Sequence, residues 1–370
     1  MGGVSTSGFM ERALALAAVA RGHTSPNPMV GAVVVRDGVI VGEGYHRRAG
    51  EAHAEVEALR QAGERARGAT LYVTLEPCAH YGRTPPCTTA VREAGVAEVH
   101  MAMLDPNSRV AGRGRAELEA AGIRTFVGEE ARRLNEVFIK HITTGVPFVT
   151  AKFAMSLDGK IATCRGDSQW ISCESSRGEV HALRAQHDAV MVGVGTLLAD
   201  DPQLNVRLGA PPVATDPPRQ PSRIVVDSRA RTPLGARVLD PATGGHTIVC
   251  VSDLAPATAV EALRQRDVEV LVVPCLDGLV DLAAVLEVLG RRQITSVLLE
   301  GGGMLLASAF ARGLVDKVVA YVAPLIIGGD RAPSPVRGEG ALSLAEAVRL
   351  RDLDVGCVGT DVRLVAYVER

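Results

Sequence analysis

The sequence predicts a protein of two α/β domains. Its 370 residues exceed the usual length of a single domain. Hydrophobic residues make up 47% of the chain, which is ample material for two cores. In both halves, segments with helical periodicity alternate with short β-branched runs, and this alternation is typical of sheets covered by helices.

The first half predicts a mixed sheet with helices on both faces. It opens with an Ala- and Leu-rich helix and continues with two β-branched runs around Asp37-Gly38, a dipeptide typical of tight hairpins. Alternating helices and strands follow. The expected elements are a helix over 9–21, a hairpin within 29–45, a helix over 52–63, a strand over 69–77, a helix from Cys87, a strand over 96–104, a helix over 115–122 and a strand over 123–128.

A break near residue 146 separates this half from the second. Gly145 and Pro147 interrupt the segment KHITTGVPFV, and a new strand is expected from about Phe148. We therefore expect a first domain over 1–146 and a second over 147–370. The second half alternates again, with strands expected over 148–157, 189–194, 222–227, 247–252, 268–273, 296–300, 316–324 and 362–369, and helices over 175–186, 259–266, 281–290 and after the glycine run 301–303.

Composition argues against several classes of protein. The formal net charge is −2 and aromatic residues make up 3% of the chain, so a surface built to coat nucleic acid or an anionic membrane is not expected. No apolar run is long enough for a transmembrane helix, and the N-terminal segment lacks the pattern of a secretory signal. Five of the seven cysteines have no motif spacing, which indicates reduced thiols in the cytoplasm.

The segment TLEPCAHYGRTPPC, residues 74–87, carries the chemistry of the first half. Zinc favours four tetrahedral ligands, and a catalytic zinc keeps one of the four positions for water. Cys78 and Cys87 supply two thiolates, and the helix expected from Cys87 favours a thiolate at its N-terminus. Upstream, His53 lies in an H-x-E arrangement and can supply the third ligand.

Glu55, the acidic member of this arrangement, need not bind the metal. It can take a proton from the zinc-bound water and return it to a leaving amine. H-x-E followed by P-C…C is typical of zinc nucleobase deaminases. Two other interpretations stay open: His80 can replace His53 as the third ligand, which leaves Glu55 idle, or the cysteines can be core thiols.

Both halves resemble the bifunctional deaminase/reductase family of riboflavin biosynthesis. In the first half the resemblance is carried by GHTSPNPMVGAVVV, GEGYHRRAGEAHAEVEAL, TLEPCAHYGRTPPC and DPN. In the second half it is carried by AKFAMSLDGKIAT, SQWIS, LRAQHDAVMVGVGTLLADDPQLNVR, RIVVDS, LLEGGGMLL and APLIIGG. The general deaminase motif has two residues between its cysteines, whereas here Cys78 and Cys87 have the longer spacing of the riboflavin family.

The resemblance implies a cytidine-deaminase-like α/β/α domain followed by a dihydrofolate-reductase-like α/β domain. The implied substrate is a small phosphorylated pyrimidine, 2,5-diamino-6-ribosylamino-4(3H)-pyrimidinone 5′-phosphate. The first domain replaces its 2-amino group with a carbonyl oxygen and releases ammonia. The second domain reduces the ribosyl group to ribityl and gives 5-amino-6-ribitylaminouracil 5′-phosphate. Zn²⁺ and NADPH are the implied cofactors.

The resemblance also implies the residues of the deaminase site. It makes His53, Cys78 and Cys87 the zinc ligands and Glu55 the proton shuttle. The substrate pocket is expected to include Asn27, His46, His80, Arg83, Asp105 and Asn107. From the residues alone, turn formation explains Asn27 and the DPN segment nearly as well, and Arg83 is either a phosphate ligand or a solvated cation.

For the reductase, the resemblance implies two further groups of residues. Those at the cofactor are Lys152, Ala154, Trp170, Thr196, Asp200, Ser228, Gly301, Gly302 and Gly303, and those at the substrate are Ser168, Arg184, Leu204, Arg207 and Glu300. The glycine run can cradle a phosphate or simply turn the chain, and no G-x-G-x-x-G predicts a Rossmann fold. Lys152, Asp200 and Glu300 are all candidates for moving protons, and the residues do not decide among them.

Two competing functions need to be distinguished from this one. One is a deaminase that edits a base in tRNA or DNA, and the other is a binding module whose zinc is only structural. The low charge argues against the first and Glu55 argues against the second. We expect a homo-oligomer, either a dimer or a tetramer, that binds neither nucleic acid nor membrane.

Overall fold

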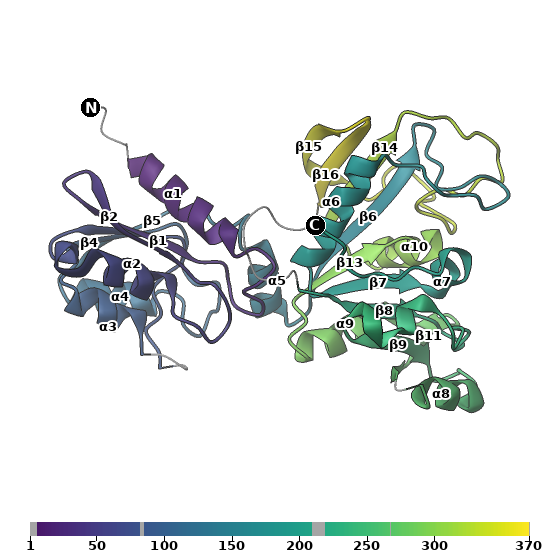
Figure 1. The fold of residues 1–370 in the computed structure, drawn as a ribbon, viewed down its shortest axis with the longest axis horizontal. Coiled ribbons are helices and arrows are strands. Elements are labelled where there is room, and N and C mark those ends of the chain that lie inside the picture. Colours follow the sequence, from purple (N-terminus) through teal and green to yellow (C-terminus); the bar gives the residue numbers. More distant parts are fainter. Residues whose placement is uncertain (1–5, 82–84, 209–218, 267, 370) are drawn as a thin grey trace. The chain divides into compact units, whose positions relative to one another are not determined.

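The computed structural model describes residues 6–81, 85–208, 219–266 and 268–369 (Figure 1). The chain divides into two compact units, Met1–Gly145 and Val146–Arg370. Each unit is built around its own sheet. Among the described residues, no helix has the length and apolar character needed to cross a membrane.

The first unit contains a five-stranded sheet with the strand order β2-β1-β3-β4-β5. β1 pairs antiparallel with β2 and β3, while β3, β4 and β5 are parallel, so the predicted mixed sheet is confirmed. The elements are α1 (Thr6–Val19), β1 (Gly31–Arg36), β2 (Val39–Tyr45), α2 (Ala54–Ala62), the 3-10 helix η1 (Gly63–Ala66), β3 (Thr70–Val73), α3 (Cys87–Glu93), β4 (Glu98–Met101), α4 (Arg113–Ala120), β5 (Arg124–Val127) and α5 (Glu136–Thr144).

Helices α1 and α2 lie on opposite faces of this sheet. A Cβ atom at Gly31 would lie 2.1 Å from the carbonyl oxygen of Ala13 in α1, whereas one at Gly44 would lie 2.5 Å from that of Ala54 in α2. Gly31 pairs with Tyr45, the neighbour of Gly44, and successive residues of a strand point to opposite faces. The predicted α/β/α layering of the first unit is therefore confirmed.

Helix α5 is not among the elements expected from the sequence. The segment is rich in β-branched residues, which are weak helix formers, and Gly145 and Pro147 follow it, so the sequence indicates only a break between the two domains here. In the structure Gly145 has a φ of 76° and ends the helix, and its N–H donates to the carbonyl oxygen of His141. Glycine at this position is the usual way to close a helix.

The second unit contains a nine-stranded sheet with the order β10-β9-β8-β7-β13-β6-β14-β16-β15. Its strands are parallel except for the β14/β16 and β16/β15 pairs. The elements are β6 (Phe148–Ser156), α6 (Glu174–Gln186), β7 (Ala189–Gly193), α7 (Val194–Asp200), β8 (Ser222–Val226), η2 (Arg237–Leu239), η3 (Pro241–Thr243), β9 (Thr247–Ser252), α8 (Ala257–Arg264), β10 (Glu269–Val273), β11 (Cys275–Leu276), β12 (Leu279–Val280), α9 (Leu282–Arg291), β13 (Ser296–Glu300), α10 (Gly303–Ala311), β14 (Lys317–Ala323), β15 (Leu350–Val358) and β16 (Asp361–Val368).

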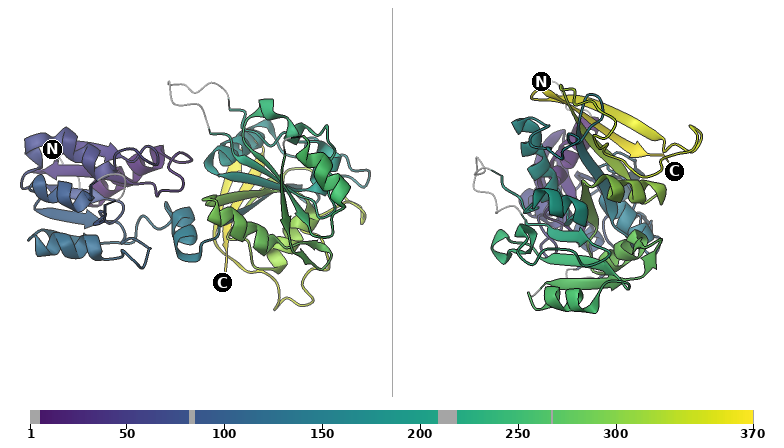
Figure 2. Two further views of the ribbon diagram at one scale, coloured as in Figure 1. Left: turned by 90° about the horizontal axis from the view of Figure 1, so that it is seen from below. Right: turned by 90° about the vertical axis from the view of Figure 1, so that its right-hand side faces the viewer.

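Helices cover both faces of the second sheet, as Figure 2 shows. On β13, Leu298 packs with Leu197 of α7 and Leu263 of α8. The next residue, Leu299, belongs to a different core cluster that contains Leu305 of α10. Because neighbouring strand residues point to opposite faces, each face of the sheet has its own layer of helices, and the predicted α/β class is confirmed.

Candidate active sites

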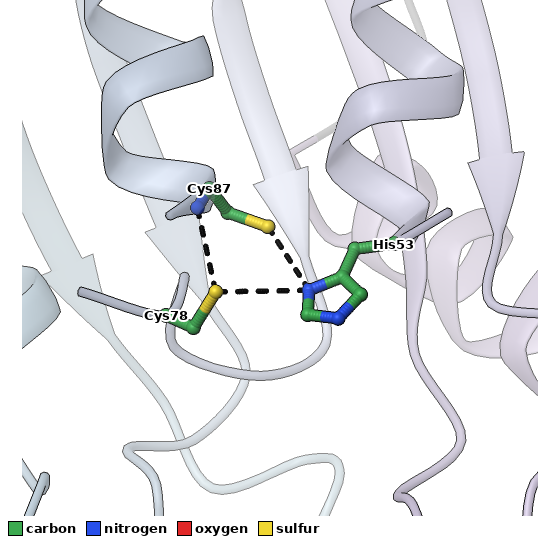
Figure 3. A group of neighbouring side chains, drawn as sticks. All are labelled: His53, Cys78 and Cys87. Atoms are coloured by element: carbon green, nitrogen blue, oxygen red, sulfur yellow. Dashed lines mark hydrogen bonds between the residues drawn. The ribbon is translucent and has the colours of Figure 1, made fainter. Parts of the chain in front are cut away.

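Three donor side chains of the first unit converge on one point (Figure 3). His53 is the N-cap of α2, Cys78 lies in the loop after β3, and Cys87 is the first residue of α3. His53 Nδ1 lies 3.1 Å from Cys87 Sγ and 3.7 Å from Cys78 Sγ. The Cys87 backbone N–H also donates to Cys78 Sγ at 3.3 Å, so the α3 N-terminus holds that sulfur in place.

This donor set fits a zinc ion. All three ligand atoms lie within 4.8 Å of one another. In a tetrahedral site with ordinary zinc–ligand bond lengths, ligand atoms are separated by about 3.5 to 3.8 Å. Two sulfurs and one imidazole nitrogen are soft and intermediate ligands of the kind that zinc prefers. The described residues contain this one group, so the alternative in which His80 replaces His53 is wrong.

The two thiols differ strongly in acidity. A hydrogen bond from Cys87 lowers the pKa of Cys78 to about 4, and Cys87, which keeps the shared proton, has a raised pKa. The hydrogen bond with Cys78 in turn raises the pKa of His53. The three donors therefore share protons among themselves, and a bound cation would displace these protons.

Glu55 lies next to this cluster, in the first turn of α2, and is only 3% exposed. Burial raises its pKa to about 7. A carboxyl group with that pKa can accept and return a proton near neutral pH. Glu55 is not among the three donors brought together, which leaves it available for proton transfer.

A cavity of about 580 Å³ opens beside the donor cluster. Its polar lining includes five predicted substrate residues: Asn27, His46, His80, Asp105 and Asn107. The remaining predicted residue of this pocket, Arg83, lies outside the described residues. The cavity walls come from segments far apart in the sequence, before β1, after β2, after β3 and after β4.

His46 determines how Asn27 faces the cavity. His46 Nδ1 lies 3.1 Å from the Ala52 carbonyl oxygen, which can only accept, so Nδ1 carries the ring proton. Nε2 is then an acceptor, and Asn27 Nδ2 donates to it at 3.1 Å. Burial lowers the pKa of His46, which favours this neutral form. The Oδ1 atom of Asn27 thus remains as an acceptor for a ligand.

In the second unit, Arg184 and Glu300 form a buried ion pair. Arg184 Nε and Nη2 donate to the two carboxylate oxygens of Glu300 at 2.6 and 2.9 Å, and Nη1 donates to the Asn205 carbonyl oxygen. Burial raises the pKa of Glu300, but Arg184 outweighs burial, so the pKa lies below its ordinary value. Much of the Arg184 guanidinium is therefore engaged within the protein.

Lys152 lies beside this ion pair on β6, opposite Glu300 in the β13/β6 register. Burial lowers the pKa of its ammonium group, and the nearby Glu300 opposes that shift. Its Nζ atom also lies 5.9 Å from the centre of the Tyr321 ring. A buried lysine with a lowered pKa gives up its proton more readily than an exposed one.

Other predicted reductase residues lie in the loop between β6 and α6, at the end of α7 and just beyond β8. Ser168 Oγ donates to Asp200 at 3.3 Å, and Arg177 stacks 4.7 Å from the centre of the exposed Trp170 ring. Ser228, directly beyond Asp227 at the end of β8, accepts from the Val280 N–H. Carboxyl ends of parallel strands are where α/β proteins usually bind ligands.

The glycine run lies between β13 and α10. Gly301 and Gly302 have φ values of 71° and 85°, which only glycine adopts easily. A Cβ atom at Gly302 would lie 3.1 Å from Thr196 Oγ1, and one at Gly303 would lie 2.5 Å from Arg337. The run therefore combines a tight turn with close backbone packing beside Thr196.

Three predicted residues of the second unit are held mainly by the protein itself. Leu204 is 2% exposed and packs in the core, so its backbone is the part that can reach a ligand. Arg207 is exposed and donates to Asn205 and Gln203. Ala154 packs in a small cluster around Tyr321.

Comparison with known proteins identifies the chain. A model of the cytidine and deoxycytidylate deaminase zinc-binding region matches residues 5–103, and one of the RibD C-terminal domain matches residues 147–364. Riboflavin biosynthesis protein RibD of Actinobacillus pleuropneumoniae is 45% identical over 364 residues, which cover 97% of this chain and 94% of that protein. The chain belongs to the RibD family.

Other members of the RibD family agree with this assignment. RibD of Escherichia coli K12 is 45% identical, with 96% of this chain and 97% of that protein covered. Acinetobacter baumannii RibD, form 1, has a TM-score of 0.85 at 40% identity, covering 98% of both chains. A diaminohydroxyphosphoribosylaminopyrimidine deaminase/5-amino-6-(5-phosphoribosylamino)uracil reductase from Thermotoga maritima has a TM-score of 0.84 at 35% identity, again covering 98% of both.

As a member of the RibD family, the chain is a bifunctional deaminase and reductase of riboflavin biosynthesis, with Zn²⁺ and NADPH as cofactors. The cytidine-deaminase-like first part and the RibD reductase fold of the second are confirmed. The two competing functions, nucleic-acid editing and a purely structural zinc, are contradicted. The predicted reaction on the phosphorylated pyrimidine is consistent with the family.

Glu76 and Phe138 are among the residues that line the RibD deaminase cavity without having been predicted from the sequence. Glu76 precedes the Pro-Cys pair and is 5% exposed, and the sequence predicts only that it belongs to a strand. Phe138 comes from α5, more than fifty positions beyond Cys78. Nothing in the sequence shows that Glu76 is buried, and nothing in it connects Phe138 to the pocket.

Proposed function

We propose that the first unit deaminates the pyrimidine and the second reduces its ribosyl group. The donor cluster and its cavity lie in the first unit, and the Lys152, Arg184 and Glu300 group lies in the second. The deaminase and reductase family regions fall within the same two parts of the chain. The proposed domains are accordingly 1–146 and 147–370.

In the deaminase, His53, Cys78 and Cys87 would hold the zinc ion. When bound, zinc supplies a Lewis acid that lets water react as hydroxide near neutral pH. Glu55 accepts the proton of the attacking water and passes it to the 2-amino group. A C–O bond forms, the C–N bond breaks, and ammonia leaves with that proton. The second proton of the water moves from the new hydroxyl to a ring nitrogen, which leaves the carbonyl.

The cavity residues orient the pyrimidine for this exchange. Asn27 Oδ1, set by the His46 hydrogen bond, accepts from a ring or amino N–H of the substrate. Asp105 Oδ1 accepts from the Asn107 N–H, and Asn107 Oδ1 from the Arg109 N–H. The Asp105 Oδ2 and Asn107 Nδ2 atoms then remain for the ligand. Polar edges of opposite character thus bind a ring that carries both donors and acceptors.

The observation that carries the deaminase proposal is a buried Glu55 beside three converging zinc donors. Glu55→Gln removes the titrating group and leaves the side-chain shape. We expect ammonia release from the phosphorylated pyrimidine to fall by at least about 10²-fold, while metal analysis still finds zinc. Reductase activity of the same chain serves as the internal control. Normal ammonia release by this variant would rule the mechanism out.

In the reductase, we propose that Lys152 donates the proton that accompanies reduction. When bound, NADPH would supply the hydride needed at C1′ of the opened ribosyl unit. Lys152 protonates the nitrogen attached to that carbon, so the C=N bond becomes a C–N single bond. Glu300 is less suited to donate a proton, because Arg184 holds it as a carboxylate. Asp200 is exposed and bonded to Ser168.

Lys152→Met tests this assignment. The substitution removes the proton and keeps an unbranched side chain, so we expect NADPH oxidation to slow by about 10²-fold or more. NADPH binding, followed by cofactor fluorescence, and ammonia release should both persist. Lys317→Met, at the start of β14, is a matched control on the same sheet. A Lys152→Met enzyme with an unchanged reduction rate would exclude the role.

We further propose that the chain forms a homo-oligomer in the cytoplasm. β15 is an edge strand, and its Leu353 and Val355 side chains are 63% and 59% exposed. Exposed apolar edges of this kind are typical of subunit contacts. All seven cysteines are free thiols, as is usual in the reducing cytoplasm. Sedimentation of the native chain tests the assembly, and a monomer at micromolar concentration would contradict it.

A further inference from the structure

Glu76 connects the metal-binding loop to the opposite wall of the deaminase cavity. It lies two residues before Cys78, and its side chain is almost completely buried. Glu76 Oε2 accepts the backbone N–H groups of Asp105 at 3.0 Å and Gly112 at 2.9 Å. Glu76 Oε1 accepts the N–H of Arg115 at 3.0 Å. A single carboxylate thus receives three main-chain donors.

The three donors define both ends of one loop. Asp105 lies just after β4 and lines the cavity, whereas Gly112 is the N-cap of α4 and Arg115 lies in its first turn. N–H groups at a helix start have no partner within the helix and favour a negative group nearby. Gly112 has no side chain of its own to supply that group. Glu76 therefore caps α4 from another element and closes the loop between Asp105 and Arg115.

The loop contains Asp105, Asn107 and Val110, all of which line the cavity. Asp105 and Asn107 hold the next turn of the loop through their own side chains, so their remaining polar atoms keep fixed directions. Without Glu76, this turn would keep its local shape but lose its attachment to the strand end that carries Cys78.

Gly114 shows how closely the first turn of α4 packs against the Glu76-Pro77 segment. A Cβ atom at Gly114 would lie 2.0 Å from the carbonyl oxygen of Pro77 and 3.2 Å from Glu76 Oε1. The first turn of α4 therefore packs directly on the Glu76-Pro77 backbone with no space for a methyl group. The hydrogen bonds and this close packing together fix the distance between the loop and Cys78.

We propose that Glu76 is a positioning residue for the pyrimidine: it holds the Asp105–Asn107 wall at a set distance from the metal-binding cysteines. This inference rests on the proposed function, in which that wall contacts the substrate. Glu76 itself binds no reacting atom. Its loss should therefore weaken substrate recognition far more than it slows the chemical step.

Glu76→Gln is the sharpest test. Gln keeps the size of the side chain, but one oxygen becomes an NH₂ group that faces a backbone N–H instead of accepting from it. We expect KM for the phosphorylated pyrimidine to rise about tenfold, with kcat changed less than about threefold. Zinc content and NADPH oxidation should equal those of the unmodified chain. Glu93→Gln, on the exposed end of α3, is the matched control.

Hydrogen exchange provides a second readout that a general loss of stability would not reproduce. In Glu76→Gln, the amides of Asp105, Gly112 and Arg115 should lose protection selectively, while β3 and α2 remain protected. An unchanged KM, or a loss of zinc equal to the loss of activity, would overturn the inference.

Asn107→Ala separates this inference from the proposed function. If Asn107→Ala raises KM and Glu76→Gln does not, the loop recognises substrate without help from Glu76, and the positioning role is wrong. If neither variant changes KM, the loop does not bind the substrate. The proposed substrate contact of Asn107 and the positioning role of Glu76 are then both overturned. A rise in KM in both variants, with zinc retained, supports the inference.

Discussion

Asp158 illustrates how one carboxylate can hold a loop of the second unit. It lies in the turn Asp158-Gly159, directly after β6. Its oxygens accept from Ser156 Oγ and from the N–H groups of Ile327 and Gly328. These contacts, with the Ser156 hydroxyl first, lower the pKa of Asp158 to about 2.

Asp158 should make stability depend on pH in the acid range. Its folded pKa lies below the ordinary 3.8, so between these values the unfolded chain binds more protons and stability rises with pH. The contribution is complete above about pH 4 and is lost as the pH falls towards 2. We expect Asp158→Asn to melt at a lower temperature than the unmodified chain at neutral pH. Calorimetry should show this difference shrinking below pH 4.

Asp330→Asn is the control for this measurement. Asp330 is exposed on the loop that contains Ile327 and Gly328, so its substitution removes one negative charge from that loop and leaves the Asp158 contacts in place. If the difference in melting temperature between Asp158→Asn and the unmodified chain stays constant down to pH 2, the ionised Asp158 carboxylate is not the cause of that difference.

At the scale of single residues, the metal donors could be predicted from the sequence, because zinc ligands occur in motifs with a recognisable spacing. His53, Cys78 and Cys87 lie in short motifs, and local elements bring them together. Glu76 was not recognised, because its partners are backbone groups of a loop whose path depends on the whole sheet. Every residue except proline has a main-chain N–H group. The residue types that donate to Glu76 therefore do not indicate that they bind a carboxylate.

Strand β2 packs closely against helix α2 because two of its residues are glycines. Cβ atoms at Gly42 and Gly44 would lie 2.1 and 2.5 Å from carbonyl oxygens of α2, at Ala58 and Ala54. The missing side chains let the helix pack directly on the strand. Because α2 starts right after His53, this contact also sets the position of the first metal donor.

Gly44→Ala should therefore damage both stability and metal binding. The added methyl group pushes the start of α2 outward, and overpacking of this kind costs about 1 to 3 kcal/mol in the free energy of unfolding. Denaturant unfolding and zinc competition with a chelator measure the two effects. Gly178→Ala, in α6, is the control, since no atom lies within 4 Å of its added Cβ. Wild-type zinc affinity in Gly44→Ala would show that the contact does not position His53.

Some helices and strands could be predicted from the sequence, and others could not. Helices with a clear apolar stripe and strands of buried β-branched residues were predicted, α9 and β13 among them. β15 was missed because Asp352, Asp354 and Gly356 disfavour a strand, and its pairing with β16 supplies what the local sequence lacks. α7 was missed because it is short and directly follows β7.

At the scale of the molecule, each unit has a core of its own. One hydrophobic cluster is drawn from residues between Phe9 and Ala131, with Ile139 of α5 packed against it. The other clusters begin at Val149 and extend to Ala320 and Val358. Because a domain folds around a continuous core, the two halves should be able to fold separately.

Separate expression of residues 1–146 and 147–370 tests this independence. We expect the first fragment to bind zinc and release ammonia, and the second to oxidise NADPH with the deaminated intermediate. Rates within about threefold of the whole chain are expected, because single domains usually fold alone. A fragment that unfolds, or one that has the wrong activity, would refute the division.

Phe138 has a consequence for how small a working deaminase can be. It reaches the cavity from α5, a helix that ends one residue before Gly145, and the Glu76-bound loop also lies beyond residue 103. The zinc-binding region shared with other deaminases stops at residue 103. A protein built from that region alone would contain the three zinc donors. It would lack Phe138 and the Glu76-bound loop, which line the cavity where we propose that the substrate binds.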